Sequence, residues 1–226
     1  MSRFKGTSLI DLHSHSTFSD EALIPSELAR RAEAKGYVAL AITDHADHAT
    51  LDWIVPRMVR VCERICTAFS IRVPPGVELT HVHPAHIAEL TCEARRMGAR
   101  IVVVHGETLV EPVRPGTNLA AIEASVDILA HPGLISDDEA ALAAKQGVFL
   151  EITSRKGHSL SHGHVLHMAR KHGAGLVLDT DSHEPGDLLE RGFAEKIARG
   201  AGMTEEEASR MFRNSLSLVE KAWKTP

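Results

Sequence analysis

The sequence has 226 residues, 15 of them histidine, and a formal net charge of -5 with histidine counted as neutral. One α/β barrel around a single core accommodates this length, so we expect one domain over residues 1–226. The acidic balance disfavours a long nucleic-acid track, because binding to phosphate backbones needs a basic face. No run approaches the roughly 18 apolar residues of a membrane span, so we expect a protein without membrane contact.

Neither a signal segment nor a cysteine framework is indicated. The N-terminus contains Arg3 and Lys5 but no apolar core of a secretory signal, which makes the cytoplasm the expected location. Cys62 and Cys66 stand four apart in a helical pattern and Cys92 stands alone, with no Cys-x-x-Cys pair. We therefore expect reduced, mostly buried thiols rather than a zinc ribbon or disulfides. Histidine is unusually frequent, with 15 residues against 6 Phe, 2 Trp and 1 Tyr, so we expect the functional residues to include histidines.

Short apolar runs alternate with longer helical patterns along the chain. The predicted strands are 9–12, 38–42, 71–79, 101–104, 126–130, 148–152 and 176–178. Strands that alternate with helices indicate βα units and a parallel sheet, so the pattern predicts seven such units.

Start and stop signals predict five helices. They cover 27–35, 85–97, a run between Ser136 and Gly147, 188–199 and 204–213. Pro25 and Pro84 open the first two, and Thr204 with Glu207 fits a capping box at the last. We expect the last two helices, within about 187–223, to cover the barrel. The loop 106–117 is too short to separate domains and is a candidate lid.

Each predicted strand ends in, or is followed by, a residue type that binds metals or transfers protons. The series is His13 and His15; Asp44 and His45; Glu78; His105; His131; Glu151; Asp181 and His183. One such residue alone is more often a cap or a hydrogen-bonded side chain. Repeated α/β units, however, place their sites at the carboxyl ends of the strands, so the coincidence after all seven strands predicts one shared site.

Two of these segments contain pairs separated by one residue. His13 with His15, and Asp181 with His183, project from the same face of an extended strand, roughly 6 to 7 Å apart, and can reach one metal or two adjacent metals. Asp11 lies on the same face as His13. It is predicted either to orient the His13 imidazole or to make a hydrogen bond at the start of the strand.

The ordered series resembles the PHP (polymerase and histidinol phosphatase) family. Residues 11–15 (DLHSH) with Asp20 resemble its first motif and residues 43–45 (TDH) its second. The match continues through 76–78, 104–105, 130–132 and 181–183, and covers roughly residues 9–190. Short, histidinol-phosphatase-like members are the most similar. The resemblance implies a distorted, TIM-like (β/α)7 barrel with a trinuclear metal site.

The resemblance also implies three sets of metal ligands. His13, His15, Glu78 and Asp181 would hold one ion; Glu78, His105 and His131 a second; and Asp20, His45 and His183 a third. Mixed imidazole and carboxylate ligands suit Zn²⁺, Mn²⁺ or Fe²⁺, with up to three ions per chain. Such a cluster would attract a phosphate dianion and provide a metal-activated hydroxide for in-line attack. We expect no phosphoenzyme, because no nucleophile motif is present.

Other polar residues near the strand ends are candidates for acid/base and substrate roles. Asp44, Glu151 and His183 are the candidates to protonate the leaving group, and Glu151 is alternatively a residue that supports a ligand. The candidate substrate-binding residues are Arg155, Lys156, Arg114, His81 and His158. Arg155 and Lys156 form a predicted phosphate clamp, with two solvated charges as the alternative.

These residues predict an enzyme that hydrolyses a phosphomonoester of a small metabolite. The alternative is a PHP-type exonuclease or phosphodiesterase acting on nucleic acid, which the acidic balance and the 4% aromatic content disfavour. A non-enzymatic, degenerate PHP module is expected to lack ligands, whereas all nine are present here. Amidohydrolase chemistry is disfavoured, because the lysine that bridges the usual metal pair has no counterpart.

Overall fold

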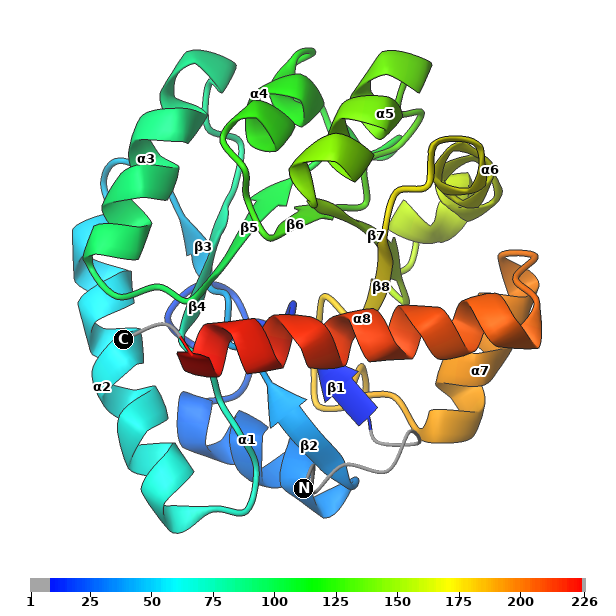
Figure 1. Ribbon diagram of the computed structural model, residues 1–226. Helices are drawn as coiled ribbons and strands as arrows, with labels where there is room; N and C mark the ends of the chain where they lie inside the picture. The colour runs from blue at the N-terminus through cyan, green and yellow to red at the C-terminus, as the bar shows by residue number, and fades with distance from the viewer. Residues whose placement is uncertain (1–8, 225–226) are drawn as a thin grey trace.

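Short parallel strands line the centre of the computed structural model, which describes residues 9–224, and helices surround them (Figure 1). The strands are β1 (Leu9–Asp11), β2 (Tyr37–Leu40), β3 (His45–Ala46), β4 (Gly76–Leu79), β5 (Ile101–His105), β6 (Ile128–Ala130), β7 (Phe149–Thr153) and β8 (Leu176–Asp179). β1 pairs with β2, and β3 to β8 pair in sequential order, always in parallel.

Backbone pairing continues across both gaps between the two sheets. Ile42, just beyond β2, pairs with Pro75 ahead of β4, and Ser14, just beyond β1, pairs with Ser182 beyond β8. β2 and β3 thus occupy one strand position, which leaves seven positions around the barrel. The predicted distorted (β/α)7 barrel is confirmed, and each predicted strand overlaps an observed one.

The helices lie outside the strands. They are α1 (Pro25–Ala34), α2 (Leu51–Ala68), α3 (Pro84–Arg96), α4 (Thr117–Glu123), α5 (Asp137–Gln146), α6 (His162–His172), α7 (Arg191–Gly200) and α8 (Glu205–Lys224), with a 3-10 turn, η1, at His158–Ser161. The capping box of α5 pairs Ser136 with Glu139, and the helix ends at Gly147, whose φ of 72° lies in the left-handed region that favours glycine.

Two predictions about local structure were wrong. The last helix was predicted to end at residue 213, but α8 continues to Lys224 because its apolar face continues through Leu218, Val219 and Ala222. The thiols were predicted to be mostly buried, yet only Cys62 is buried and Cys92 is exposed. α2, α4 and α6 were not among the predicted helices, and none of the three has a side-chain hydrogen bond at its N-cap.

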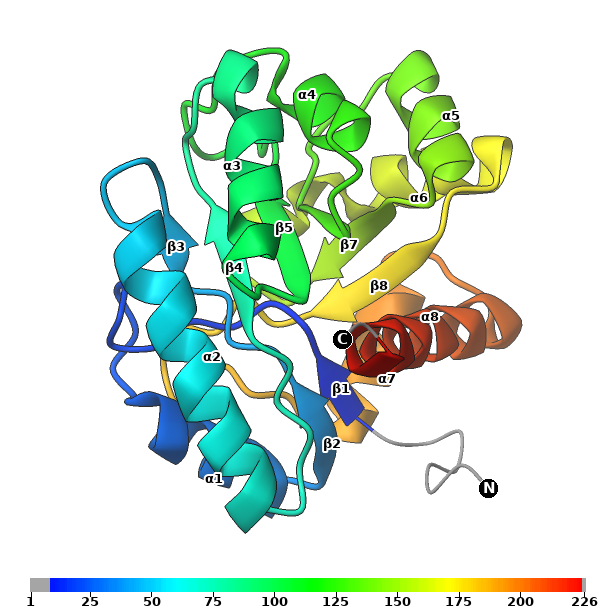
Figure 2. The ribbon, with the colours of Figure 1, turned by 60° about the vertical axis from the view of Figure 1, so that its left-hand side comes forward.

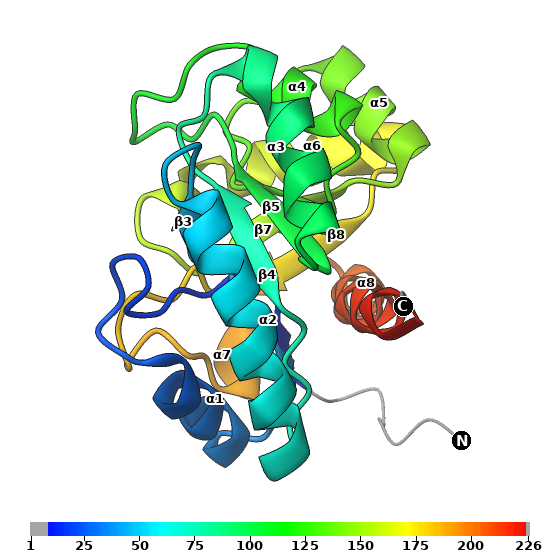
Figure 3. The same ribbon diagram turned by 90° about the vertical axis from the view of Figure 1, so that its left-hand side faces the viewer.

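Helix α8 closes the end of the barrel at which the strands begin (Figures 2 and 3). Its apolar residues pack with the cluster inside the barrel that includes Ile101, Ile128 and Val177. Asn214 donates a hydrogen bond of 2.8 Å to the carbonyl oxygen of Leu176 at the start of β8. The carboxyl ends of the strands are therefore left for the site at the opposite end.

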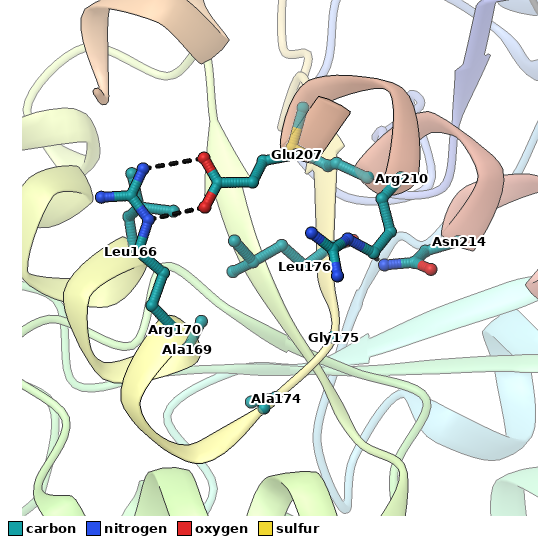
Figure 4. Close-up of a pocket in the computed structure, with 11 residues that line it drawn as sticks. Leu166, Ala169, Arg170, Ala174, Gly175, Leu176, Glu207, Arg210 and Asn214 are labelled. Carbon is teal, nitrogen blue, oxygen red and sulfur yellow. Dashed lines mark hydrogen bonds and ion pairs between the residues drawn. The ribbon is translucent and has the colours of Figure 1, made fainter. Parts of the chain in front are cut away.

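A pocket between α6, β8 and α8 lies on this closed side (Figure 4). Arg170 of α6 donates to both carboxylate oxygens of Glu207 in α8, at 2.6 and 2.8 Å, and also to the carbonyl oxygen of Gly202. Arg170 and Glu207 thus pair with each other, and these contacts attach α8 to α6.

No helix within residues 9–224 is long and apolar enough to cross a bilayer. The prediction about a secretory signal concerns Arg3 and Lys5, which lie outside the described residues.

Candidate metal centre

The carboxyl ends of the strands bring buried histidines and acids together. His13 and His15 follow β1, Glu78 lies in β4, and His131 and Asp181 directly follow β6 and β8. All of these side chains are buried. His131 and Asp181 have φ values of 29° and 51°, which residues other than glycine adopt only at a cost of about 1 to 3 kcal/mol. Strain of this kind clusters at functional sites.

The first predicted ligand set comes together as a group. His13 Nε2 lies 3.3 Å from Glu78 Oε1 and 3.7 Å from Asp181 Oδ1, and His15 Nε2 lies 3.1 Å from the same Asp181 oxygen. The ligand atoms of His13, His15 and Glu78 all lie within 4.8 Å of one another. These three residues and Asp181 surround one volume.

The third predicted set also comes together, nearer to solvent. Asp20 Oδ1 lies 3.2 Å from His183 Nε2 and 3.4 Å from His45 Nε2, and His15 joins this group. Partial burial acts to raise the pKa of Asp20, but the His183 hydrogen bond and the His45 charge outweigh it and lower that pKa to about 2. Asp20 is therefore an anionic ligand candidate at neutral pH.

The second predicted set is only partly assembled. His105 and His131 lie together, but the third side chain within 4.8 Å of their ligand atoms is His158. Glu78 turns toward the other groups, because its Oε2 lies 2.5 Å from His45 Nδ1 and accepts a hydrogen bond from the Thr80 hydroxyl. Glu78 thus lies between the first and third groups in this structure.

Several buried ligand atoms have no hydrogen-bond partner within residues 9–224. They are His13 Nε2, His15 Nδ1, Glu78 Oε1 and both ring nitrogens of His131. An unpaired buried polar group costs about 1 to 3 kcal/mol, so such a cluster calls for a ligand. Burial lowers the pKa of His15 to about 4 and that of His131 well below its usual value, so both are neutral, the form that binds metals. The residues fit a centre for divalent cations.

Glu151 stabilises this centre through contacts with two residues that carry predicted ligands, His13 and His131. Its Oε1 lies 2.7 Å from His13 Nδ1, and its Oε2 accepts a hydrogen bond from the backbone N–H of His131. Burial alone would lower the pKa of His13, but the charges of Glu151 and Glu78 outweigh it and hold that pKa well above its usual value. A carboxylate on the far ring nitrogen fixes the orientation of a ligating imidazole.

Asp11 and Asp44 accept hydrogen bonds from backbone and hydroxyl groups rather than from the side chains of the predicted metal ligands. Asp11 accepts hydrogen bonds from the backbone N–H and the hydroxyl of Thr180, so the strand-start interpretation is correct and it does not contact the His13 imidazole. Asp44 accepts from the hydroxyl groups of Ser16 and Ser19, at 2.7 Å each. Asp44 therefore shapes the loop that carries Asp20.

Of the three acid/base candidates, His183 is the one whose side chain faces the third ligand group. Its Nε2 points to Asp20, and its Nδ1 hydrogen-bonds the carbonyl oxygen of Asp181. The carboxylate of Asp44 accepts hydrogen bonds from Ser16 and Ser19, and that of Glu151 contacts His13 and the backbone N–H of His131.

The substrate-binding candidates divide into two groups. Arg155 lies at the mouth of the centre, with Nε 3.9 Å from Asp181 Oδ2, and His158 is buried with its ring stacked 4.2 Å from that of His131. His81 is exposed and its ring stacks on His105. Lys156 and Arg114 are exposed.

Sequence reasoning missed Glu111. This residue of the candidate lid loop turns inward, with Oε2 3.1 Å from His105 Nε2 and 3.3 Å from His81 Nε2. The hydrogen bond from His105 lowers the pKa of Glu111 to about 2. The available signal was an acidic residue in the loop that directly follows a ligand-bearing strand.

Comparisons with known proteins agree with this geometry. The PHP domain family model matches residues 11–105. The uncharacterized protein MJ1295 of Methanocaldococcus jannaschii is 45% identical over 199 residues, which is 87% of this chain and 91% of that protein. The chain belongs to the PHP family, and its ligand groups fit a centre for divalent cations.

More distant relatives differ in their stated activities. The DNA polymerase/3'-5' exonuclease PolX of Bacillus subtilis is 26% identical over 76% of this chain, and the match spans 34% of PolX. A chain of an archaeal ribonuclease P complex with mature tRNA has a TM-score of 0.74 at 17% identity, over 96% of this chain and 93% of that one. Histidinol phosphate phosphatase from Lactococcus lactis, solved with zinc, L-histidinol and phosphate, has a TM-score of 0.62 at 18% identity, over 86% and 94%. These structural likenesses show the fold.

Proposed function

We propose that this protein hydrolyses a phosphomonoester of a small metabolite at a centre of up to three divalent metals. The observation that carries the proposal is the convergence of buried, partly unpaired imidazole and carboxylate groups at the strand ends, with the Arg155 guanidinium at their mouth. His13, His15, Glu78, His105, His131, Asp181, Asp20, His45 and His183 are the proposed metal-binding residues. When bound, divalent cations attract a phosphate dianion and make water acidic enough to supply a nucleophile near neutral pH.

The chain's own residues bind and orient the reactants. Arg155 provides a planar donor group near Asp181 and Asp187, which is suited to two phosphate oxygens at once. Glu151 fixes His13, and Asp44 fixes the loop of Asp20. Asp44, Glu151 and His183 stay the candidates to protonate the leaving group; His183 can do so only without a metal on Nε2, because its Nδ1 faces the carbonyl oxygen of Asp181.

A second candidate function is hydrolysis of nucleic acid. The partial likeness to PolX and the fold likeness to a ribonuclease P chain favour it. The net charge of -5 and the 4% aromatic content weigh against it, because single-strand binding uses stacking side chains and a basic groove. The phosphomonoester remains our proposal.

A parallel activity screen is expected to favour small phosphomonoesters over oligonucleotides by orders of magnitude in kcat/KM. The protein is stripped with a chelator, reloaded with Mn²⁺, Fe²⁺ or Zn²⁺, and assayed on a panel of phosphomonoesters and on a labelled single-stranded oligonucleotide. Chelated protein is the control and should be inactive. Processive degradation of the oligonucleotide with poor monoester turnover would contradict the proposal and favour hydrolysis of nucleic acid instead.

Replacing Arg155 by alanine is expected to lower kcat/KM for the best monoester by roughly 10-fold or more, because a charge-assisted hydrogen bond to phosphate is lost. The metal content, measured by elemental analysis, should not change. The matched control is Lys156→Ala, which removes the neighbouring exposed charge and should have a much smaller effect. Wild-type kinetics for Arg155→Ala would show that Arg155 does not bind the phosphate and is only a solvated charge.

A further inference from the structure

Three buried histidines from consecutive βα units meet beside the first ligand group. His105 ends β5, His131 follows β6, and His158 opens η1 after β7. Their exposed fractions are 4%, 2% and 6%, and one ligand nitrogen of each lies within 4.8 Å of the other two. The family resemblance accounts for His105 and His131 as ligands but not for His158, so the third histidine requires its own explanation.

The rings are fixed so that their free nitrogens face one another. His105 Nδ1 lies 3.2 Å from the carbonyl oxygen of Gly106, and His158 Nδ1 lies 2.7 Å from the hydroxyl of Thr108. In both rings this leaves Nε2 for the shared space. Neither ring nitrogen of His131 has a hydrogen-bond partner within residues 9–224, although the side chain is buried and its Nε2 lies 3.8 Å from Asp181 Oδ2. A buried imidazole without a hydrogen bond, between two others, points to a bound ligand.

The loop after β5 adds a carboxylate to these imidazoles. Glu111 Oε2 lies 3.1 Å from His105 Nε2, and its Oε1 lies 3.4 Å from His158 Nε2. Two atoms that each bind a tetrahedral zinc ion at about 2.0 to 2.1 Å lie about 3.3 Å apart. The separations of Glu111 from His105 and His158 therefore match those of ligands that share one ion. Glu111 Oε2 also lies 3.3 Å from Nε2 of the exposed His81, and the ligand atoms of Glu111, His81 and His105 lie within 4.8 Å of one another.

The loop is held in the position that directs Glu111 inward. At its base, Glu107 Oε1 accepts hydrogen bonds from the backbone N–H groups of Gly116 and Asn118, at 2.9 Å each. Nearer its tip, Val110 packs against Gly157, so that a Cβ added there would lie 3.3 Å from the valine side chain. Gly157 directly precedes His158. The carboxylate and the third histidine are thus positioned together.

We propose that His158 and Glu111 complete a divalent-metal site with His105 and His131, and that Glu111 supplies the carboxylate of this site. Glu78 is directed instead to His13 and His45. Three neutral imidazoles and one carboxylate suit Zn²⁺ or Co²⁺. The inference rests on the metal centre of the proposed function, but it does not depend on which substrate that centre hydrolyses.

Co²⁺ titration of the full-length, metal-free protein tests this site without any substrate. Bound Co²⁺ is followed by its visible absorption and by competition with a chromophoric chelator, in wild type, His158→Gln and Glu111→Gln. Each variant is expected to bind one equivalent of Co²⁺ at least about 10-fold more weakly, with changed absorption, because even partners of metal ligands contribute that much to affinity. The remaining equivalents should bind as in wild type.

His48→Gln and Glu123→Gln are the matched controls, because both residues are exposed and outside these groups. Circular dichroism establishes that each variant is folded. Wild-type affinity for every equivalent in both His158→Gln and Glu111→Gln would overturn the proposal, and a raised KM alone would assign the two residues to the substrate. Loss of one Co²⁺ equivalent, in a protein that hydrolyses no phosphomonoester, would support the site and refute the proposed function instead.

Discussion

Replacing Glu78 by alanine is expected to release at least two divalent ions per chain and to abolish hydrolysis. Its two oxygens lie 3.3 Å from His13 Nε2 and 2.5 Å from His45 Nδ1, so the carboxylate stands between two ligand groups. Two unit charges about 4 Å apart interact by about 4 kcal/mol at an effective dielectric constant of about 20, and two divalent ions repel about four times as strongly. Without the intervening negative charge, neighbouring cations cannot both be held.

Elemental analysis of purified protein measures this effect. Wild type should contain more than one, and up to three, divalent transition metals per chain. His131→Ala is the comparison, because it removes a neutral ligand and should lose one ion, with partial recovery of activity at high metal concentration. A folded Glu78→Ala protein with full metal content, as judged by circular dichroism and metal analysis, would show that this carboxylate only stabilises the end of β4. A single ion per active wild-type chain would contradict the cluster.

The barrel and most of its ligands could be predicted from the sequence because both follow from local patterns. Strands buried on both faces need nearly continuous apolar runs, such as Val102, Val103 and Val104 in β5, and these runs marked the strand positions. A ligand that directly follows such a run, as His105 and His131 do, is positioned by the strand itself. The position of a strand end therefore determines the position of its ligand.

Roles that depend on long-range contacts could not be predicted in this way. Asp44 and His45 are adjacent in the sequence, and on extended backbone neighbouring side chains point to opposite faces. The sequence does not say which of the two faces the centre. The inward path of Glu111 depends on contacts of its loop with Asn118 and with Gly157, and no periodicity records such contacts.

Replacing Glu151 is expected to separate support of the metal centre from proton transfer. Its carboxylate lies 2.7 Å from His13 Nδ1 and accepts a hydrogen bond from the backbone N–H of His131, so it connects two ligand-bearing strand ends. Glu151→Gln keeps the size and one acceptor oxygen but removes the charge that orients His13. Metal affinity should therefore fall by about 10- to 100-fold, the usual effect of losing such a partner of a ligand.

Glu151→Ala should also destabilise the fold, because it leaves the His13 ring N–H and the His131 backbone N–H buried without an acceptor. At about 1 to 3 kcal/mol for each unpaired group, the free energy of unfolding should fall by about 2 to 6 kcal/mol. Urea unfolding in the presence of a chelator measures this loss apart from metal binding. If Glu151 were instead the acid that protonates the leaving group, Glu151→Gln would bind metals with wild-type affinity and lose kcat alone, because an amide of the same shape supports the ligands but cannot donate that proton.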